Sequence, residues 1–81
     1  MKTSDAIAII LRSECGFDET FKISCWKQSY VTIRHYLPVD ITEGMMNAVE
    51  SAGLKIVFIV VEEDDNLLQI GIADKDYYPN D

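Results

Sequence analysis

The sequence predicts an α+β fold, a two-layer α/β sandwich in which two helices pack on one face of a four-stranded sheet made mainly of antiparallel hairpins. Two segments carry apolar residues at helical spacing, and each ends at a glycine, Gly16 or Gly53. Each glycine is followed by two segments with the alternation and the residue types of strands. The element order is therefore α-β-β-α-β-β, and both helices are expected on one face of one sheet.

The chain also reads as two similar halves of one domain, residues 1–81. The two glycines lie 37 residues apart, and the centres of the two expected hairpin loops, Gln28 and Asp64, lie 36 apart. This spacing favours two α-β-β units at about 3–37 and 40–73, followed by a tail at 74–81.

The first helix is expected over residues 4–15. Thr3 or Ser4 can cap it, and Gly16 supplies the left-handed position after its last turn. Phe17 then falls where such an end makes its hydrophobic contact. The buried stripe is formed by Ala6, Ile7, Ile9, Ile10, Leu11 and Cys15.

The first hairpin is expected from strands at 20–26 and 30–37. A three-residue loop, 27–29, places the apolar faces of both strands on the same side, whereas a two-residue loop sets apolar against polar residues. One face then pairs Cys25 with Val31, Ile23 with Ile33 and Phe21 with His35, and the reverse face pairs Trp26 with Tyr30, Ser24 with Thr32 and Lys22 with Arg34.

The second helix is expected to begin after Pro38, with Asp40 as its cap and Glu43 three residues on as in a capping box. Gly53 ends it, and Leu54 takes the place that Phe17 takes after the first helix. Its buried stripe is Ile41, Met45, Ala48, Val49 and Ala52.

The second hairpin joins a strand at 55–61 to one at 67–73 through an acidic loop, 63–65. As in the first hairpin, a loop with an odd number of residues keeps the apolar faces together, and it pairs Val60 with Leu68, Phe58 with Ile70 and Ile56 with Ile72. The reverse face then also carries apolar residues, namely Val57, Ile59, Val61 and Leu67. One layer of helices cannot cover both faces, so we expect these four residues to form a homodimer interface. The alternative is that Tyr77 and Tyr78 of the tail fold back over them.

The net charge of −7 is unevenly distributed, because residues 38–81 hold ten acids and two bases. Such a surface disfavours nucleic acid and anionic membranes and favours basic partners, unless it serves solubility alone. The carboxylates expected to contact a basic partner are Glu43, Glu50, Glu62, Glu63, Asp64, Asp65, Asp74 and Asp76.

The reverse face of the first hairpin is the one basic, aromatic surface that the pattern predicts. Lys22, Trp26, Tyr30 and Arg34 would share it, and such a face can bind phosphates and stack bases. The alternative is an ordinary solvated sheet face.

The sequence does not predict an enzyme, a cofactor or a metal site. The single histidine, His35, is expected to point inward beside Phe21, and Cys25 with His35 lacks the further ligands that zinc needs. No phosphate-binding glycine loop or nucleophile motif is present. Cys15 and Cys25 are expected to be reduced core residues of a cytoplasmic protein, and no cleavage-site pattern of a signal peptide follows residues 6–11.

These observations favour a small acidic protein that acts by occupying a basic surface of a larger protein complex. Short length, strong acidity and lack of catalytic motifs fit phage or mobile-element inhibitors of the anti-CRISPR or DNA-mimic type, an argument from size and composition. The alternative is a small homodimeric regulatory or ligand-binding domain, with its ligand at the dimer seam or on the Trp26 and Tyr30 face.

Overall fold

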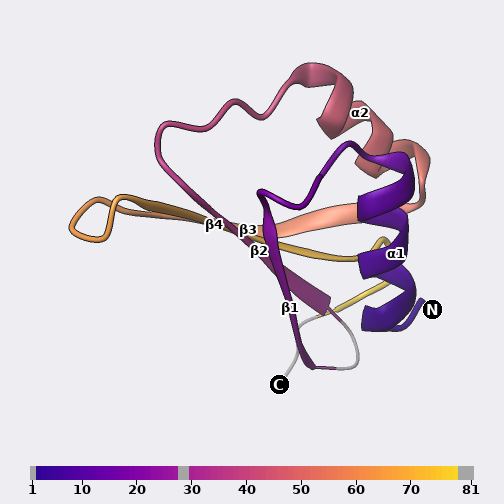
Figure 1. Cartoon of the computed structure of the whole chain (residues 1–81). Coiled ribbons are helices and arrows are strands. Elements are labelled where there is room, and N and C mark those ends of the chain that lie inside the picture. Colours follow the sequence, from indigo (N-terminus) through magenta and orange to yellow (C-terminus); the bar gives the residue numbers. More distant parts are fainter. Residues whose placement is uncertain (1, 28–29, 79–81) are drawn as a thin grey trace.

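A computed structural model of the chain describes residues 2–27 and 30–78, without the side chains of Trp26 and Lys27. Four strands form one antiparallel sheet, and both helices lie over the same face of it (Figure 1). The predicted α+β fold and element order are therefore confirmed. The elements are α1 (Ser4–Glu14), β1 (Lys22–Lys27), β2 (Tyr30–Tyr36), α2 (Glu43–Ser51), β3 (Leu54–Glu62) and β4 (Leu67–Asp74).

The strand order is β1-β2-β4-β3, so the second strands of the two α-β-β units form the centre of the sheet. Ile33 of β2 lies opposite Ile70 of β4. These residues are 37 positions apart, as are Gly16 and Gly53. This is the arrangement that a two-fold relation between the units would produce.

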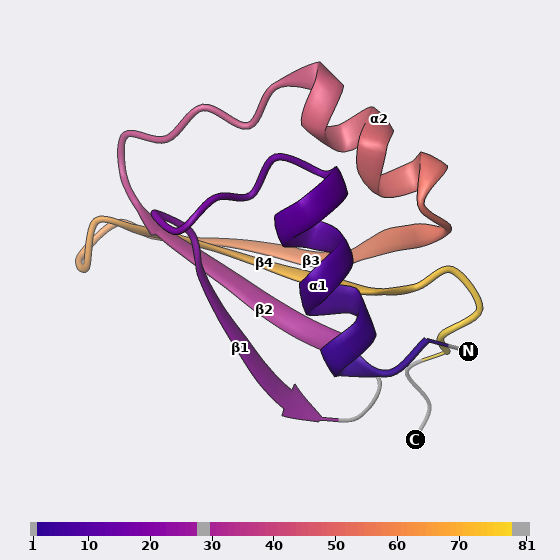
Figure 2. The same ribbon diagram turned by 45° about the vertical axis from the view of Figure 1, so that its right-hand side comes forward.

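The core lies between the helices and one part of the sheet. From α1, the fully buried Ile7 and Leu11 contribute to it, whereas α2 contributes one buried residue, Val49. α1 contacts β1, β2 and β4, and α2 contacts β3. The far end of the β3–β4 hairpin extends beyond both helices (Figure 2). No helix within the described residues has the length and apolar character needed to cross a bilayer.

The ends of α1 follow the predicted chemistry. The Thr3 side chain accepts a hydrogen bond from the Ala6 amide at 3.3 Å. Gly16 has a φ of 82°, a left-handed value that favours glycine. The Phe17 amide donates to the Leu11 carbonyl at 3.2 Å, and the Phe17 side chain is fully buried. The turn after α1 therefore also places a core side chain.

The predicted cap of α2 was wrong by two residues. Thr42, not Asp40, is the N-cap, and its hydroxyl accepts from the Met45 amide at 3.1 Å. Val39 and Ile41 both pack against the core from the segment before the helix. An extended segment places alternate residues on one side, which a helix begun after Asp40 would not do. Gly53, with a φ of 78°, follows α2 as predicted.

The predicted register of the first hairpin is correct only at its open end. Lys22 pairs with Arg34, Ile23 with Ile33 and Ser24 with Thr32. The Phe21 and His35 rings also meet, with centroids 4.5 Å apart. Beyond Ser24 the register shifts, and Lys27 instead of Trp26 pairs with Tyr30. The pairings predicted for Cys25 and Trp26 were therefore wrong, and the expected loop residues Gln28 and Ser29 lie outside the described part of the chain.

The second hairpin also contains an irregularity. The predicted pair of Ile56 and Ile72 is present, but a bulge between Ile56 and Phe58 leaves Val57 unpaired and shifts the register beyond it. The loop consequently has four residues, because Glu62 pairs with Leu67. Beyond the bulge, the predicted pairs Val60–Leu68 and Phe58–Ile70 were wrong; the structure pairs Val61 with Leu68, Ile59 with Ile70 and Phe58 with Gly71.

The two cysteines differ in environment. Both are free thiols, and Cys15 is buried as predicted, which raises the pKa of its thiol, with a smaller contribution from the Glu14 charge. The prediction that Cys25 lies in the core was wrong, because it is exposed. Its sulfur lies 3.8 Å from the Ser4 carbonyl, at the N-terminal end of α1. The helix begins there and does not cover this end of β1.

Candidate functional site

The acidic turn, residues 62–65, lies at the far end of the β3–β4 hairpin. Amides of Asp65 and Asn66 donate to the carbonyls of Glu62 and Glu63 at 3.2 and 3.1 Å. The Asn66 side-chain amide donates to the Leu37 carbonyl, and the Leu37 amide donates to the Asn66 carbonyl, both at 2.8 Å. The turn is thus tied to the segment after β2.

The carboxylates of the acidic turn surround a shallow hollow of about 480 Å³. Glu62 is half-buried and accepts a hydrogen bond from the Gln69 side chain at 3.0 Å. Glu63, Asp64 and Asp65 are exposed. Within the described residues, the only ion pair joins two residues elsewhere, Lys2 and Asp74. The turn therefore presents negative charge without a cation beside it.

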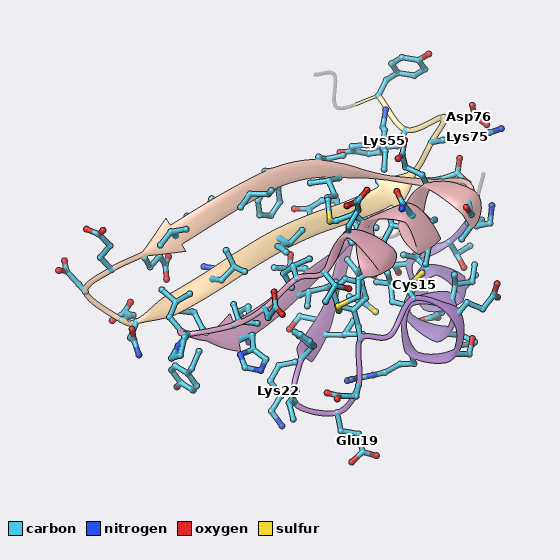
Figure 3. The ribbon with its side chains drawn as sticks, turned by 90° about the horizontal axis from the view of Figure 1, so that it is seen from above. Cys15, Glu19, Lys22, Lys55, Lys75 and Asp76 are labelled. Atoms are coloured by element: carbon cyan, nitrogen blue, oxygen red, sulfur yellow. The ribbon has the colours of Figure 1, made fainter. Side chains whose placement is uncertain are left out.

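The other predicted partner-binding carboxylates are not part of this cluster. Glu43 begins α2 and Glu50 lies in its last turn. Asp74 and Asp76 lie at the opposite end of β4 from the acidic turn, where Figure 3 shows Asp76 beside Lys75. The eight predicted residues therefore do not form one surface.

Asp74 serves the fold and is not available to a partner. It is 4% exposed, and its carboxylate accepts hydrogen bonds from the amides of Asp76 and Lys2 at 2.9 and 3.0 Å. The Lys2 ammonium lies 3.6 Å away. These groups, the Asp76 amide first and the Lys2 amide next, hold the pKa of the Asp74 carboxyl below its ordinary range. Asp74 thus ties the start of the chain to the end of β4.

The four residues predicted as a dimer interface do not share one face. Because of the bulge, Ile59 and Val61 pair with Ile70 and Leu68 and so lie on the helix side of the sheet. Leu67 pairs with Glu62 and belongs to the opposite face, and Val57 is the unpaired bulge residue. Ile59 and Val61 are nonetheless 57% and 52% exposed, because the hairpin extends past the helices.

The predicted sheet face also divides into two parts. Arg34 and Tyr30 share a face of β2, but four residues of strand separate them by about 13 Å. The Tyr30 ring packs with the rings of Phe58 and Tyr77, at centroid distances of 6.3 and 6.0 Å. The sequence did not predict either contact. Trp26 belongs to β1, and the structure does not describe its side chain. The aromatic and cationic residues therefore belong to separate sites.

A basic pocket of about 280 Å³ lies where β1 begins and β2 continues past it. Lys22 and Arg34, which both line the pocket, form the first pair of the β1–β2 ladder, and Figure 3 labels Lys22 on β1. His35 Nδ1 lies 2.6 Å from the Tyr36 carbonyl oxygen, so Nδ1 carries the proton that this hydrogen bond needs. The lining residues are Thr20, Lys22, Arg34, His35, Tyr36 and Leu67.

Sequence reasoning found the Lys22–Arg34 pair but missed the pocket around it. Tyr36 and Leu67 meet only because β2 pairs with β4, and no local pattern specifies that pairing. Within the described residues, no group of three or more histidine, cysteine, aspartate or glutamate side chains is arranged to hold a metal ion. Comparisons with protein-family models, curated proteins and solved structures found no match to this chain.

Proposed function

We propose that this protein is a non-enzymatic interaction module whose acidic turn, residues 62–65, docks on a Lys- and Arg-lined surface of a larger protein. The observation that carries this proposal is the placement of the turn. Its carboxylates lie at the end of a hairpin that extends past the helices, and the described structure places no cation beside them. A partner can approach this end without displacing either helix.

Composition suggests one form of this function, inhibition of a host nucleic-acid-targeting complex by a phage or mobile-element protein of the anti-CRISPR or DNA-mimic type. Carboxylates on a projecting turn would occupy a groove that otherwise binds phosphates, so nucleic acid should compete for the same surface. The free thiols of Cys15 and Cys25 favour a cytoplasmic site of action.

The test is capture of the partner from cells of the native host, followed by binding measurements with that partner. Neutralising the turn with E62Q, E63Q, D64N and D65N should weaken binding by about tenfold or more, and should flatten its dependence on salt. The control neutralises four carboxylates elsewhere, through D5N, E14Q, E19Q and D40N, and so changes the net charge equally. If both variants bind the partner as the unmodified protein does, the acidic turn is not the docking site.

The second candidate is a small homodimeric regulatory or ligand-binding domain that binds an anion in the basic pocket. The observation that favours it is the like-charge pair Lys22 and Arg34, which face each other across strands. Such a pair is unfavourable unless an anion lies beside it. Inorganic phosphate and a nucleoside monophosphate should shift the amide NMR signals of residues 20–22 and 34–36 in the unmodified protein but not in R34A. Lys75→Ala, which removes an exposed cation elsewhere, should leave the shifts in place.

A further inference from the structure

β3 is an edge strand with an unusually apolar sequence. It pairs with β4 on one side, and no other strand of the described sheet lies on its other side. An edge strand presents a row of unpaired N–H and C=O groups that can pair with another chain. The opposite edge, β1, is six residues long and has a lysine at each end, Lys22 and Lys27. β3 has nine residues, and six consecutive ones are apolar.

The exposed part of β3 is apolar on both faces. Ile59, Val60 and Val61 are 57%, 42% and 52% exposed, and successive strand residues point to opposite faces. The helices end short of this segment (Figure 2). Within the described tail, Tyr77 packs on Tyr30, and its carbonyl accepts from Lys55. The described tail thus lies at the other end of β3, where Figure 3 shows Lys55, and leaves the exposed segment open.

Two features protect the first half of β3 from pairing with another chain. Lys55 places a charge there, and the bulge at Val57 interrupts the regular ladder. Charges and bulges are the devices by which natural edge strands avoid such pairing. Neither lies within residues 58–61, so this segment is the open part of the edge.

We propose that a second copy of this chain pairs with β3, antiparallel and centred on Ile59, to form one continuous eight-stranded sheet. A two-fold axis perpendicular to the sheet keeps the helices of both copies on the same side. It requires each residue to face one on the same face of the partner strand. Centring on Ile59 meets this condition, because Ile59 faces the partner's Ile59 and Phe58 faces the partner's Val60.

Charge complementarity favours a second copy in this orientation. The apolar run has Lys55 before it and Glu62 and Glu63 after it. Antiparallel pairing centred on Ile59 places Lys55 opposite the partner's Glu62 at both ends of the seam, because the bulge at Val57 takes up one residue, and both side chains belong to the outer face. The two Glu62 residues then lie about 20 Å apart, so salt screens most of their repulsion. Parallel pairing would place like charges together. The acidic turns stay exposed, and the inference does not depend on the proposed docking function.

The oligomeric state is tested by sedimentation velocity over a range of concentrations. The unmodified protein should sediment at twice its chain mass of 9.2 kDa. Ile59→Lys should give a monomer, because the two lysines would face each other in a desolvated seam. Ile9→Lys, which changes an isoleucine that is 66% exposed on α1, should remain dimeric. Circular dichroism checks that both variants are folded. A monomeric unmodified protein, or a dimeric Ile59→Lys variant, would overturn the proposal.

The register is tested by cross-linking, because only the central residue faces its own copy. Ile59→Cys in a Cys25→Ser background should form a disulfide-linked dimer on mild oxidation with diamide. Ile9→Cys in the same background should not, and the remaining Cys15 is 2% exposed. If the Ile59→Cys variant is dimeric but does not cross-link, antiparallel pairing centred on this residue is excluded.

Discussion

The two α-β-β units share an element order but differ in how well the helix covers its hairpin. α1 contacts three strands and buries Ser4, Ile7 and Leu11. α2 packs mainly on β3, and Val49 is its one buried residue. The first unit therefore supplies most of the core, and the far end of the second unit's hairpin extends past the helices (Figure 1).

The same contrast holds for charge and for the sheet edges. Residues 1–37 carry a net charge of +1 and contribute most of the basic pocket, whereas residues 38–81 carry −8 and contribute the acidic turn. The edge strand of the first unit has lysines at both ends, and that of the second is apolar. The two units thus share an element order, whereas their charges and their edge strands differ.

The largest expected effect compares two side chains of similar volume, one on each helix. Leu11→Ala in α1 should lower the free energy of unfolding by about 4 kcal/mol, because the side chain is fully buried and leaves a cavity. Met45→Ala in α2 should cost about 2 kcal/mol, because Met45 is only half-buried. Chemical denaturation measures both. Equal losses would show that α2 is as firmly packed as α1.

The next effect concerns the outer face of the second hairpin, where the Phe58 ring lies over Gly71. A Cβ added at Gly71 would overlap the Phe58 ring, so one of them must move. Gly71→Ala should therefore destabilise the protein by about 1–3 kcal/mol. The cost should shrink in a Phe58→Ala background, where the ring is absent. Gly44→Ala is the matched control, because its Cβ would meet only the Thr42 hydroxyl, at 3.7 Å. That change should stabilise α2 by up to about 1 kcal/mol.

Local patterns were sufficient to predict the elements and fold class but not the register of either hairpin. Gly16 and Gly53 mark helix ends because a positive φ is a local requirement. The argument from an odd number of loop residues assumed that both ladders are unbroken. Each hairpin contains an irregularity that the loop length does not reveal. A glycine within a strand often marks a close approach of another group, so Gly71 was the available signal for the Phe58 contact.

The candidate sites were predictable to the extent that they are contiguous in sequence. The acidic turn is a run of four carboxylates, and the structure keeps them together. The basic pocket draws Leu67 from β4, and the aromatic contacts of Tyr30 join β2, β3 and the tail, so both depend on strand order. The sequence placed Asp74 among the surface carboxylates. Its buried hydrogen bond comes from Lys2, a residue 72 positions away, which no local pattern reveals. The spacing of residues within a single helix or strand does not predict contacts between residues that are far apart in the sequence.

The smallest effect tests this link between the two ends of the chain. The pKa of the Asp74 carboxyl is lowered in the folded protein, so its charge stabilises the fold above the ordinary aspartate value of 3.8. That contribution is lost as the pH falls through the lower, folded pKa. Asp74→Asn should therefore reduce the free energy of unfolding at neutral pH and lose less stability than the unmodified protein on acidification.

Denaturation curves between pH 2 and pH 7 would measure this difference. Asp18 also has a lowered pKa, caused first by the Thr20 hydroxyl and then by the Thr20 amide, so some acid sensitivity should remain in Asp74→Asn. Asp76→Asn is the control, because Asp76 is exposed and contributes its amide, not its carboxylate, to the link. If Asp74→Asn and the unmodified protein lose stability in parallel below pH 4, the carboxylate does not hold Lys2 against the end of β4. The end of β4 would then keep its position without help from the start of the chain.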